Sequence, residues 1–455
     1  MLANKKNLRY FYWFTFEYFK RHSKLIFISF IISIITIIGI VSFWPYLPNI
    51  YHSSKAEIHS LVGNYNEENI PKDILIKISS GILFVNNKGQ FIPALASSWE
   101  TKDNGRIYKI HLKKDLYWND GKSFTTKDIN FKFKDVEIKA NGDYLLEFTL
   151  QKPLAIFPSY LTKPIIKESL TGVAGLYKIE RITKNNNAIK ELRLSPNKTK
   201  LPFIIYRFFE NESQMINAYK LGEINQMVIY RKSVVDTFTS WKNSKIIKSV
   251  DYSRLLTVFF NLKNSKLKEK EVRQAINISI DRKKLDEFGV EANGPIPPIS
   301  WAYSGLLKKN IYDEELAKQL ANKYFEATET GKLNISTFYE YSDISNLFKE
   351  MLAKVGINTN LNLASNINAG QFDILLAYWN VPMDPDQYYF WHSTQKEGNI
   401  TNYVNLKIDK LLEDGRTTSI VEDRKQIYLD FQKIISDDNP ALFLYYPYIY
   451  TIKRK

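Results

Sequence analysis

The alternation of apolar and polar positions changes character along this chain. From about residue 61 to residue 200 the apolar runs are short and are separated by turn residues, a pattern that predicts β-strands. The runs are DILIKI (73–78), GILFVNNKGQFI (81–92, with a turn at 86–89), RIYKIHL (106–112) and YLLEFTL (144–150). In the third run, His111 shares one strand face with Ile107 and Lys109, which predicts a half-exposed structural histidine.

After residue 200, apolar residues recur at helical spacing and strand-like runs lie between the helices. The predicted helices are residues 212–224, 268–288, 313–327, 346–356, 407–415 and 423–438. The predicted strands between them are LLTVFFNL (255–262), KLNISTFY (332–339), NTNLNLA (358–364) and FDILLAYW (372–379). This alternation predicts α/β lobes with largely parallel sheets.

The segment LIFISFIISIITIIGIVSFW (25–44) contains no charge and is long enough to cross a bilayer as a helix. A cationic run lies before it, in residues 1–24, so we expect a single-pass cell-membrane protein with a cytoplasmic N-terminus and an extracytoplasmic remainder. A cleaved signal peptide is the alternative. The bulky residues of VSFWPYLPN (41–49) disfavour cleavage. Residues 45–57 then form a short tether.

Composition narrows the function classes. The net charge is +15, but residues 1–24 contribute +5 of it and residues 453–455 contribute +3. The sequence contains no clustered stripe of arginines, so nucleic-acid binding is not expected. The chain has no cysteine, which excludes disulfides and a thiol nucleophile, and its five histidines are scattered, so no metal site is expected. No catalytic motif or cofactor-binding loop is present, and we therefore expect neither an enzyme nor a cofactor.

Several segments, in order, resemble a known family. They include PALASSWE (93–100), YKIHLKKDLYWNDGKSFTTKDINFKF (108–133), VRQAINISIDRKKL (272–285), ANGPIPP (292–298) and FDILLAYWNVPMDPDQYYF (372–390). Over residues 70–450 the chain resembles the extracytoplasmic solute-binding proteins of ABC importers, family five, the peptide-binding type. Within the second segment, Asn119 to Gly121 predicts a turn and Thr125 to Asp128 has capping-box spacing. Tyr117 and Trp118 are expected to pack under that turn.

The resemblance implies an α/β clamshell of the type II periplasmic-binding-protein kind, in which two lobes close on a ligand. Lobe I would comprise residues 58–252, completed by 425–455, and lobe II residues 253–424. The implied partners are a peptide or another small solute and an ABC permease with its ATPase. The lipid bilayer is a further partner, through residues 25–44.

The resemblance also suggests where the solute binds. Tyr378 and Trp379 end an apolar strand of the kind that opens onto a cleft, where an aromatic ring either stacks on a ligand or packs in the core. Ser80 and Gly81 match a cleft-edge segment where an extended peptide could approach, although a plain turn is the alternative. Trp301 and Tyr303 would line the opening between the lobes.

The chain departs from the family pattern in two places. The usual helical insertion after DINFKF is missing, which implies a trimmed subdomain. Where peptide binders of the family often hold the peptide ammonium with an aspartate, this chain has Asn380, Val381, Pro382 and Met383. Asn380 is retained as a candidate ligand group, and Asp384 either contacts the ligand or, with Asp386, belongs to a structural Asp-Pro-Asp turn.

These departures keep a second function open. The first hypothesis is a membrane-anchored receptor that captures peptides or a similar solute for import. The alternative is a surface sensor or interaction domain that keeps the fold without import.

Overall fold

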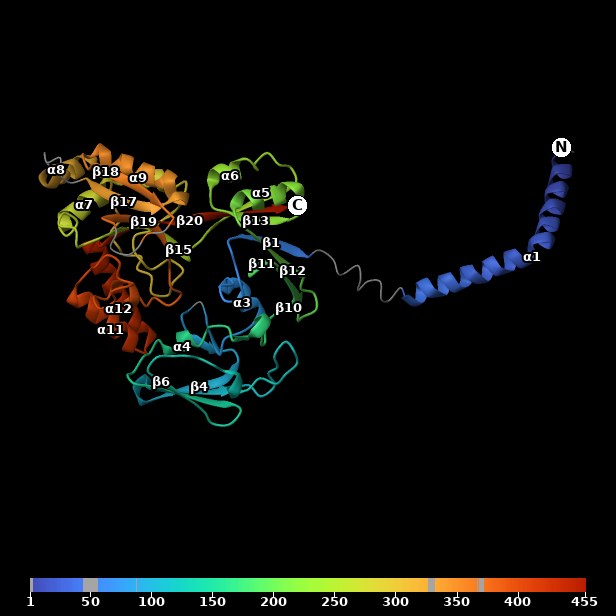
Figure 1. The fold of residues 1–455 in the computed structure, drawn as a ribbon, viewed down its shortest axis with the longest axis horizontal. Coiled ribbons are helices and arrows are strands. Elements are labelled where there is room, and N and C mark those ends of the chain that lie inside the picture. Colours follow the sequence, from blue (N-terminus) through green and yellow to red (C-terminus); the bar gives the residue numbers. More distant parts are fainter. Residues whose placement is uncertain (1–2, 44–55, 87, 326–331, 366, 368–371) are drawn as a thin grey trace.

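This computed structural model describes residues 3–43, 56–86, 88–325, 332–365, 367 and 372–455. A long helix, α1 (Ala3–Phe43), precedes the body and departs from helical geometry at His22 (Figure 1). Its stretch Tyr10–Gly39 is long and apolar enough to cross a membrane, and its most apolar window is not buried against the protein. Residues 25–43 of the predicted anchor lie in this helix. Trp44 and residues 45–55 of the predicted tether lie outside the described residues.

Lobe I contains two four-stranded sheets, with the strand orders β1-β12-β11-β10 and β4-β5-β7-β6. Its first elements are β1 Glu57–Val62, α3 Lys72–Ile78, β2 Leu83–Val85, β3 Phe91–Pro93, β4 Ala96–Lys102, β5 Ile107–Leu112, β6 Val136–Ala140, β7 Leu145–Leu150, α4 Phe157–Tyr160, β8 Ile166–Lys167, β9 Thr171–Gly172, β10 Tyr177–Asn185, β11 Ala188–Pro196 and β12 Ile204–Phe209. The predicted hairpin of residues 81–92 is confirmed as β2 and β3, and residues 106–112 and 144–150 form the paired strands β5 and β7. His111 is exposed on β5, as predicted.

A third part of lobe I packs around the end of the chain. It comprises α5 Glu212–Leu221, β13 Gln226–Ile229, α6 Lys232–Asp236 and β14 Ser244–Val250. Its core joins Met215, Tyr219 and Phe238 to Ile452 of the last strand, β20 (Ala441–Arg454).

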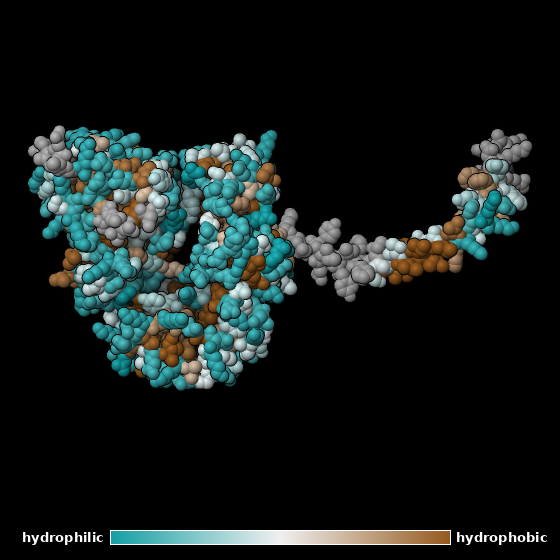
Figure 2. Space-filling model, viewed as in Figure 1, coloured by the Kyte–Doolittle hydropathy of each residue, from teal (hydrophilic) through white to brown (hydrophobic). Residues whose placement is uncertain are grey.

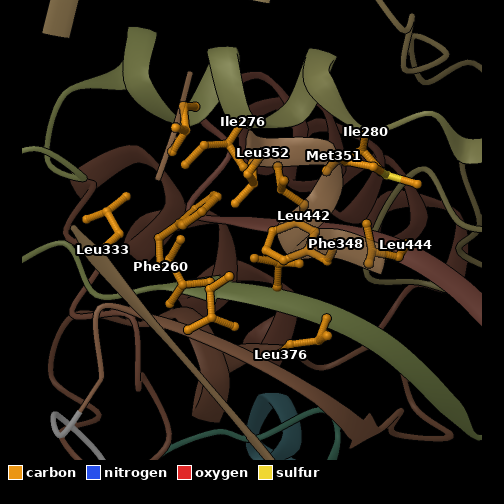
Figure 3. Packing of buried hydrophobic residues seen from close by; sticks show 14 of the residues in the cluster. Phe260, Ile276, Ile280, Leu333, Phe348, Met351, Leu352, Leu376, Leu442 and Leu444 are labelled. Atoms are coloured by element: carbon orange, nitrogen blue, oxygen red, sulfur yellow. The ribbon is translucent and has the colours of Figure 1, made fainter. Parts of the chain in front are cut away.

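Lobe II is built on the strands β15 Arg254–Phe260, β16 Gly289–Glu291, β17 Leu333–Phe338, β18 Thr359–Ala364 and β19 Ile374–Asn380. Its helices are α7 Lys270–Ser279, α8 Glu314–Phe325, α9 Ser342–Lys354, α10 Tyr388–Trp391, α11 Leu406–Thr417 and α12 Val421–Asp438. Successive side chains of β15 bury opposite faces of the sheet: Leu256, Val258 and Phe260 pack against α7, α8 and α9 (Figure 3). Leu255 and Phe259 pack on the other face, with residues of α11 and α12. The helices and strands predicted after residue 200 are present where the structure describes them, except that the predicted helix 268–288 ends at Ser279 and is followed by a short 3-10 turn at Arg282–Leu285.

Strand β20 joins the two lobes (Figure 1). Its first half pairs with β15 and β16 of lobe II, whereas residues from Tyr448 onward pair with β13 and β14 of lobe I. Helix α12 also packs on lobe II, through Tyr428, Phe431 and Ile435. The expected assignment of residues 425–455 to lobe I therefore matches only the end of the chain.

The prediction of largely parallel sheets is wrong. Parallel pairing occurs between β1 and β12 and between β17 and its neighbours β18 and β19. The other ladders of both lobes are antiparallel. Hairpins such as β10–β11 pair this way through a short turn, and β20 enters its sheet from the far end of the sequence. Strand–helix alternation therefore identified the elements but not their directions.

Two local predictions are also corrected. Residues 73–78 form helix α3 instead of a strand: Ile74 and Ile78, one turn apart, are buried, whereas Ile76 is exposed. The Thr125–Asp128 capping box is confirmed, and Trp118 is buried under the turn, but Tyr117 is 58% exposed. Both predictions failed because a short run of alternating or adjacent apolar residues does not show which side faces the core.

Candidate functional site

The surface is hollowed between the two lobes, and groups from both lobes meet at the edges of this hollow (Figure 2). The backbone N–H of Ala155 in lobe I donates to the carbonyl oxygen of Arg416 in lobe II at 2.7 Å. Lys72 Nζ lies 3.7 Å from Met383 Sδ. Two open depressions on lobe I, of about 510 and 500 Å³, lie along the sheet of β10 to β12 and not between the lobes. The interlobe cleft is therefore the better candidate, because both lobes contribute groups to it.

Gly89, at the tip of the β2–β3 hairpin, lies closely against Trp301 of lobe II. Its φ is +77°, and a Cβ added there would lie 2.2 Å from Cδ1 of Trp301 in lobe II. Trp301 in turn packs edge-on against Tyr428 and lies 5.5 Å from the guanidinium of Arg424. Trp301 therefore contacts lobe I, and its predicted role in lining the opening for a solute stays a prediction.

Tyr378 and Trp379 point to opposite faces of the lobe II sheet, because they are successive residues of β19. Trp379 is 8% exposed and packs against Phe390 and Trp391, and its Nε1 is buried without a hydrogen-bond partner. Tyr378 is only partly buried, and its ring faces Tyr341 and Arg254. The structure therefore does not bring the two predicted aromatic residues to one surface.

Asp384 and Asp386 bind arginines of lobe II. The carboxylate of Asp384 accepts hydrogen bonds from both terminal nitrogens of Arg424, whose side chain is 6% exposed. Asp386 Oδ2 accepts from Nε and Nη2 of Arg416 at 3.0 and 2.9 Å. Burial opposes the charge of Arg424, but its bonds to Asp384 raise the pKa of the guanidinium above its ordinary value. Of the two interpretations of Asp384, this geometry favours the structural one.

Ser80 and Gly81 lie inside lobe I, where the chain's own backbone occupies their hydrogen-bonding groups. The Ser80 N–H donates to Val173, its carbonyl accepts from Ile165, and the Gly81 carbonyl accepts from Leu95. A Cβ at Gly81 would lie 2.6 Å from the backbone of Thr162. The close approach that glycine permits here is made by residues 161–162, which leaves less room for an extended peptide.

The remaining candidates differ in exposure. Asn380 is exposed and pairs with Arg254 at the end of the β15–β19 ladder, so its side chain is available to a solute. Tyr303 is partly buried against the core that contains Tyr446. Within the described residues, no group of three or more acidic or histidine side chains is placed to hold a metal.

Sequence reasoning missed four residues of this region: Gly89, Arg254, Arg416 and Arg424. Gly89 was visible only as a turn glycine. Arg424 lies 40 residues from Asp384 in the chain, and no spacing pattern connects them. Local pattern cannot find such pairs, because it carries no information on which distant elements pack together.

Known proteins share this architecture. Residues 90–400 match the family described as bacterial extracellular solute-binding proteins, family 5, middle region. The oligopeptide-binding protein AppA of Bacillus subtilis (strain 168) is 26% identical, covering 84% of this chain and 83% of that protein. The solved structures of AppA from Bacillus subtilis with a nonapeptide and of NikZ from Campylobacter jejuni with Ni(L-His) each give a TM-score of 0.71 at 22% identity, covering 88% of this chain and 94% of the other. These similarities confirm the predicted two-lobed α/β fold.

Proposed function

Because this chain belongs to the bacterial extracellular solute-binding proteins of family 5, we propose that it captures a peptide or a similar solute between its lobes and delivers it to an ABC permease. The observation that carries the proposal is the hollow between two lobes that already meet at Gly89 and Trp301 (Figure 2). A ligand that contacts both lobes stabilises the closed arrangement relative to the open one, and a permease can then distinguish loaded from empty receptor.

The similar proteins support a choice of solute class. AppA of Bacillus subtilis is an oligopeptide-binding protein, and NikZ of Campylobacter jejuni was solved with a nickel–histidine complex. Peptides are the first choice for this chain. Amino-acid chelates of nickel are the second, since they present similar amino and carboxylate groups.

Thermal unfolding of the full chain in detergent micelles tests the proposal. Peptide pools and the nickel–histidine complex are added separately, each at saturating concentration. A ligand present at a hundred times its Kd stabilises the native state by about 2.7 kcal/mol, so we expect a clear rise in Tm. Small-angle scattering of the same samples should show a smaller radius of gyration. An unchanged Tm with every ligand would contradict the proposal.

We further propose that α1 anchors the protein in the cytoplasmic membrane with its binding lobes outside. The stretch Tyr10–Gly39 supports this, and the basic residues at its N-terminal side favour a cytoplasmic N-terminus. The full chain should remain in the membrane fraction after a high-salt wash, whereas a chain lacking residues 1–55 should be recovered in soluble form. N-terminal sequencing of the mature protein provides the decisive measurement: a start after residue 44 would show a cleaved signal instead.

A further inference from the structure

Arg254 carries a positive charge between the lobes without a described acidic partner. It begins β15 in lobe II, opposite Asn380 at the end of β19. Its guanidinium lies 4.9 Å from the ring centroid of Tyr230, which follows β13 of lobe I, and 4.7 Å from that of Tyr378 in lobe II. Arg254 therefore lies where the two lobes meet, beside the predicted cleft residues.

The surroundings of Arg254 hold its side chain but leave most of its donors unused. Among the described residues, its side chain donates from Nη2 to the hydroxyl of Tyr341 at 3.4 Å and hydrogen-bonds the Tyr230 hydroxyl, and it forms no ion pair. An arginine has five N–H donors arranged in a planar fork. Arg254 is only partly buried and none of its nitrogens is a buried atom without a partner, so the unused donors remain within reach of a solute.

Within the part of the chain that the structure describes, no neighbouring carboxylate forms an ion pair with this guanidinium. Burial raises the pKa of Tyr230 and of Tyr341, and it raises the pKa of Tyr378 to about 12, so all three phenols stay neutral at physiological pH. The nearby carboxylate of Asp251 keeps its own charge, but it accepts from the backbone N–H and hydroxyl of Ser253 and from the Tyr230 hydroxyl and forms no described ion pair with Arg254.

The acidic groups at the end of β19 are also paired. Asp384 is bound by Arg424 and Asp386 by Arg416, and the positions between Asn380 and Asp384 carry no carboxylate. Glu340, next to Tyr341, is exposed and belongs to no described ion pair. The arrangement therefore presents an available cation at Arg254, whereas the carboxylates of Asp384 and Asp386 at the end of β19 are already bound by arginines.

We propose that Arg254, held between Tyr230 and Tyr378, binds a carboxylate of the solute, so that this receptor selects solutes by an anionic end. This inference rests on the proposed solute-binding function and specifies which end of the solute is recognised. A planar guanidinium fits a carboxylate through two parallel hydrogen bonds, and its stacking between rings fixes the orientation of the fork. Because Tyr230 belongs to lobe I, the same contact ties the carboxylate to the junction of both lobes.

Calorimetric titration of the full chain in detergent tests the inference with three peptide pools. The first contains neutral side chains and a free C-terminus, the second is the same pool amidated at the C-terminus, and the third is the amidated pool with one internal glutamate. We expect the first pool to bind and the second to bind about ten- to a hundredfold more weakly, as for loss of a charged hydrogen-bonded pair. Binding restored in the third pool identifies a side-chain carboxylate as a second accepted source.

Variants of Arg254 test whether this residue causes the preference for a free carboxylate. Arg254→Gln should weaken binding of the first pool by a similar factor and abolish the difference between free and amidated pools, whereas Arg254→Lys should keep part of that difference. Arg181→Gln, which removes an exposed arginine paired with Glu191 on β11, is the matched control and should bind as the wild type does. Melting curves without ligand check that each variant is folded.

The outcomes separate the two proposals. If the wild type binds free and amidated pools equally, or if folded Arg254→Gln keeps the preference, the carboxylate inference is overturned while solute binding stands. If the wild type binds no pool and no nickel–histidine complex, both proposals are overturned.

Discussion

Replacing Asp384 with Asn is expected to lower the free energy of unfolding by about 3 kcal/mol, near the lower end of the range for breaking a buried ion pair. Arg424 is 5% exposed, and Asp384 is the carboxylate that satisfies its two terminal nitrogens. The amide can accept only part of these bonds and leaves a buried guanidinium without a counter-charge. The measurement is the Tm of the full chain in detergent, which should fall by several degrees.

Two further variants show whether the loss of stability comes from the unpaired charge of Arg424. Asp430→Asn removes an exposed carboxylate from α12, the helix that carries Arg424, and should change the Tm only slightly. Combining Asp384→Leu with Arg424→Met removes both charges and should recover part of the stability lost by Asp384→Asn, because no buried charge is then left alone. An Asp384→Asn variant as stable as the wild type would mean that the Asp384–Arg424 pair does not stabilise the fold.

Replacing Gly89 with Ala is expected to weaken solute binding on the order of ten- to a hundredfold. The new Cβ would overlap the Trp301 ring across the cleft, and overpacking of this kind costs about 1–3 kcal/mol. The cost falls on the closed arrangement, which is the one that the solute stabilises. Calorimetry with a bound peptide pool measures the affinity, and small-angle scattering should show a larger radius of gyration.

Gly121 supplies a matched control, since its φ is +86° and an added Cβ meets no atom within 4 Å. Gly121→Ala carries the same backbone strain, about 1 kcal/mol, without a contact across the cleft. It should lower the Tm slightly and leave affinity unchanged. Adding Trp301→Ala to Gly89→Ala should restore binding in part. Equal affinities of Gly89→Ala and the wild type for the solute would show that the contact between Gly89 and Trp301 does not limit closure of the lobes.

The order of helices and strands could be predicted over most of the body, because side-chain periodicity is set locally. The capping box at Thr125–Asp128 was predictable for the same reason, since both of its partners lie within one turn. The candidate site was predicted less well. Tyr378 and Trp379 were correctly placed at the end of a strand, but they face opposite sides of the sheet, and only Tyr378 faces Arg254.

Asp384 and Gly81 also show that the local sequence does not identify a residue's partner. Asp384 was expected to be either a ligand group or a turn residue. Which role it takes depends on Arg424, which approaches from helix α12. Gly81 was expected to leave space for a second backbone, and the backbone that approaches it belongs to the chain itself. In each case the residue type was informative, but the partner was supplied by an element distant in sequence.

By itself, the sequence determined that this chain has an apolar N-terminal segment able to cross a membrane, α/β lobes without cysteine chemistry, and the succession of motifs that marks a solute-binding family. Those properties depend on composition and on neighbours along the chain. The tertiary structure decided that β20 runs through both lobes, that Asp384 pairs with Arg424 while Arg254 has no ion-pair partner among the described residues, and that Gly89 meets Trp301. These features depend on which distant segments pack together. The arrangement of charges in the cleft is therefore decided by tertiary packing and not by neighbours along the chain.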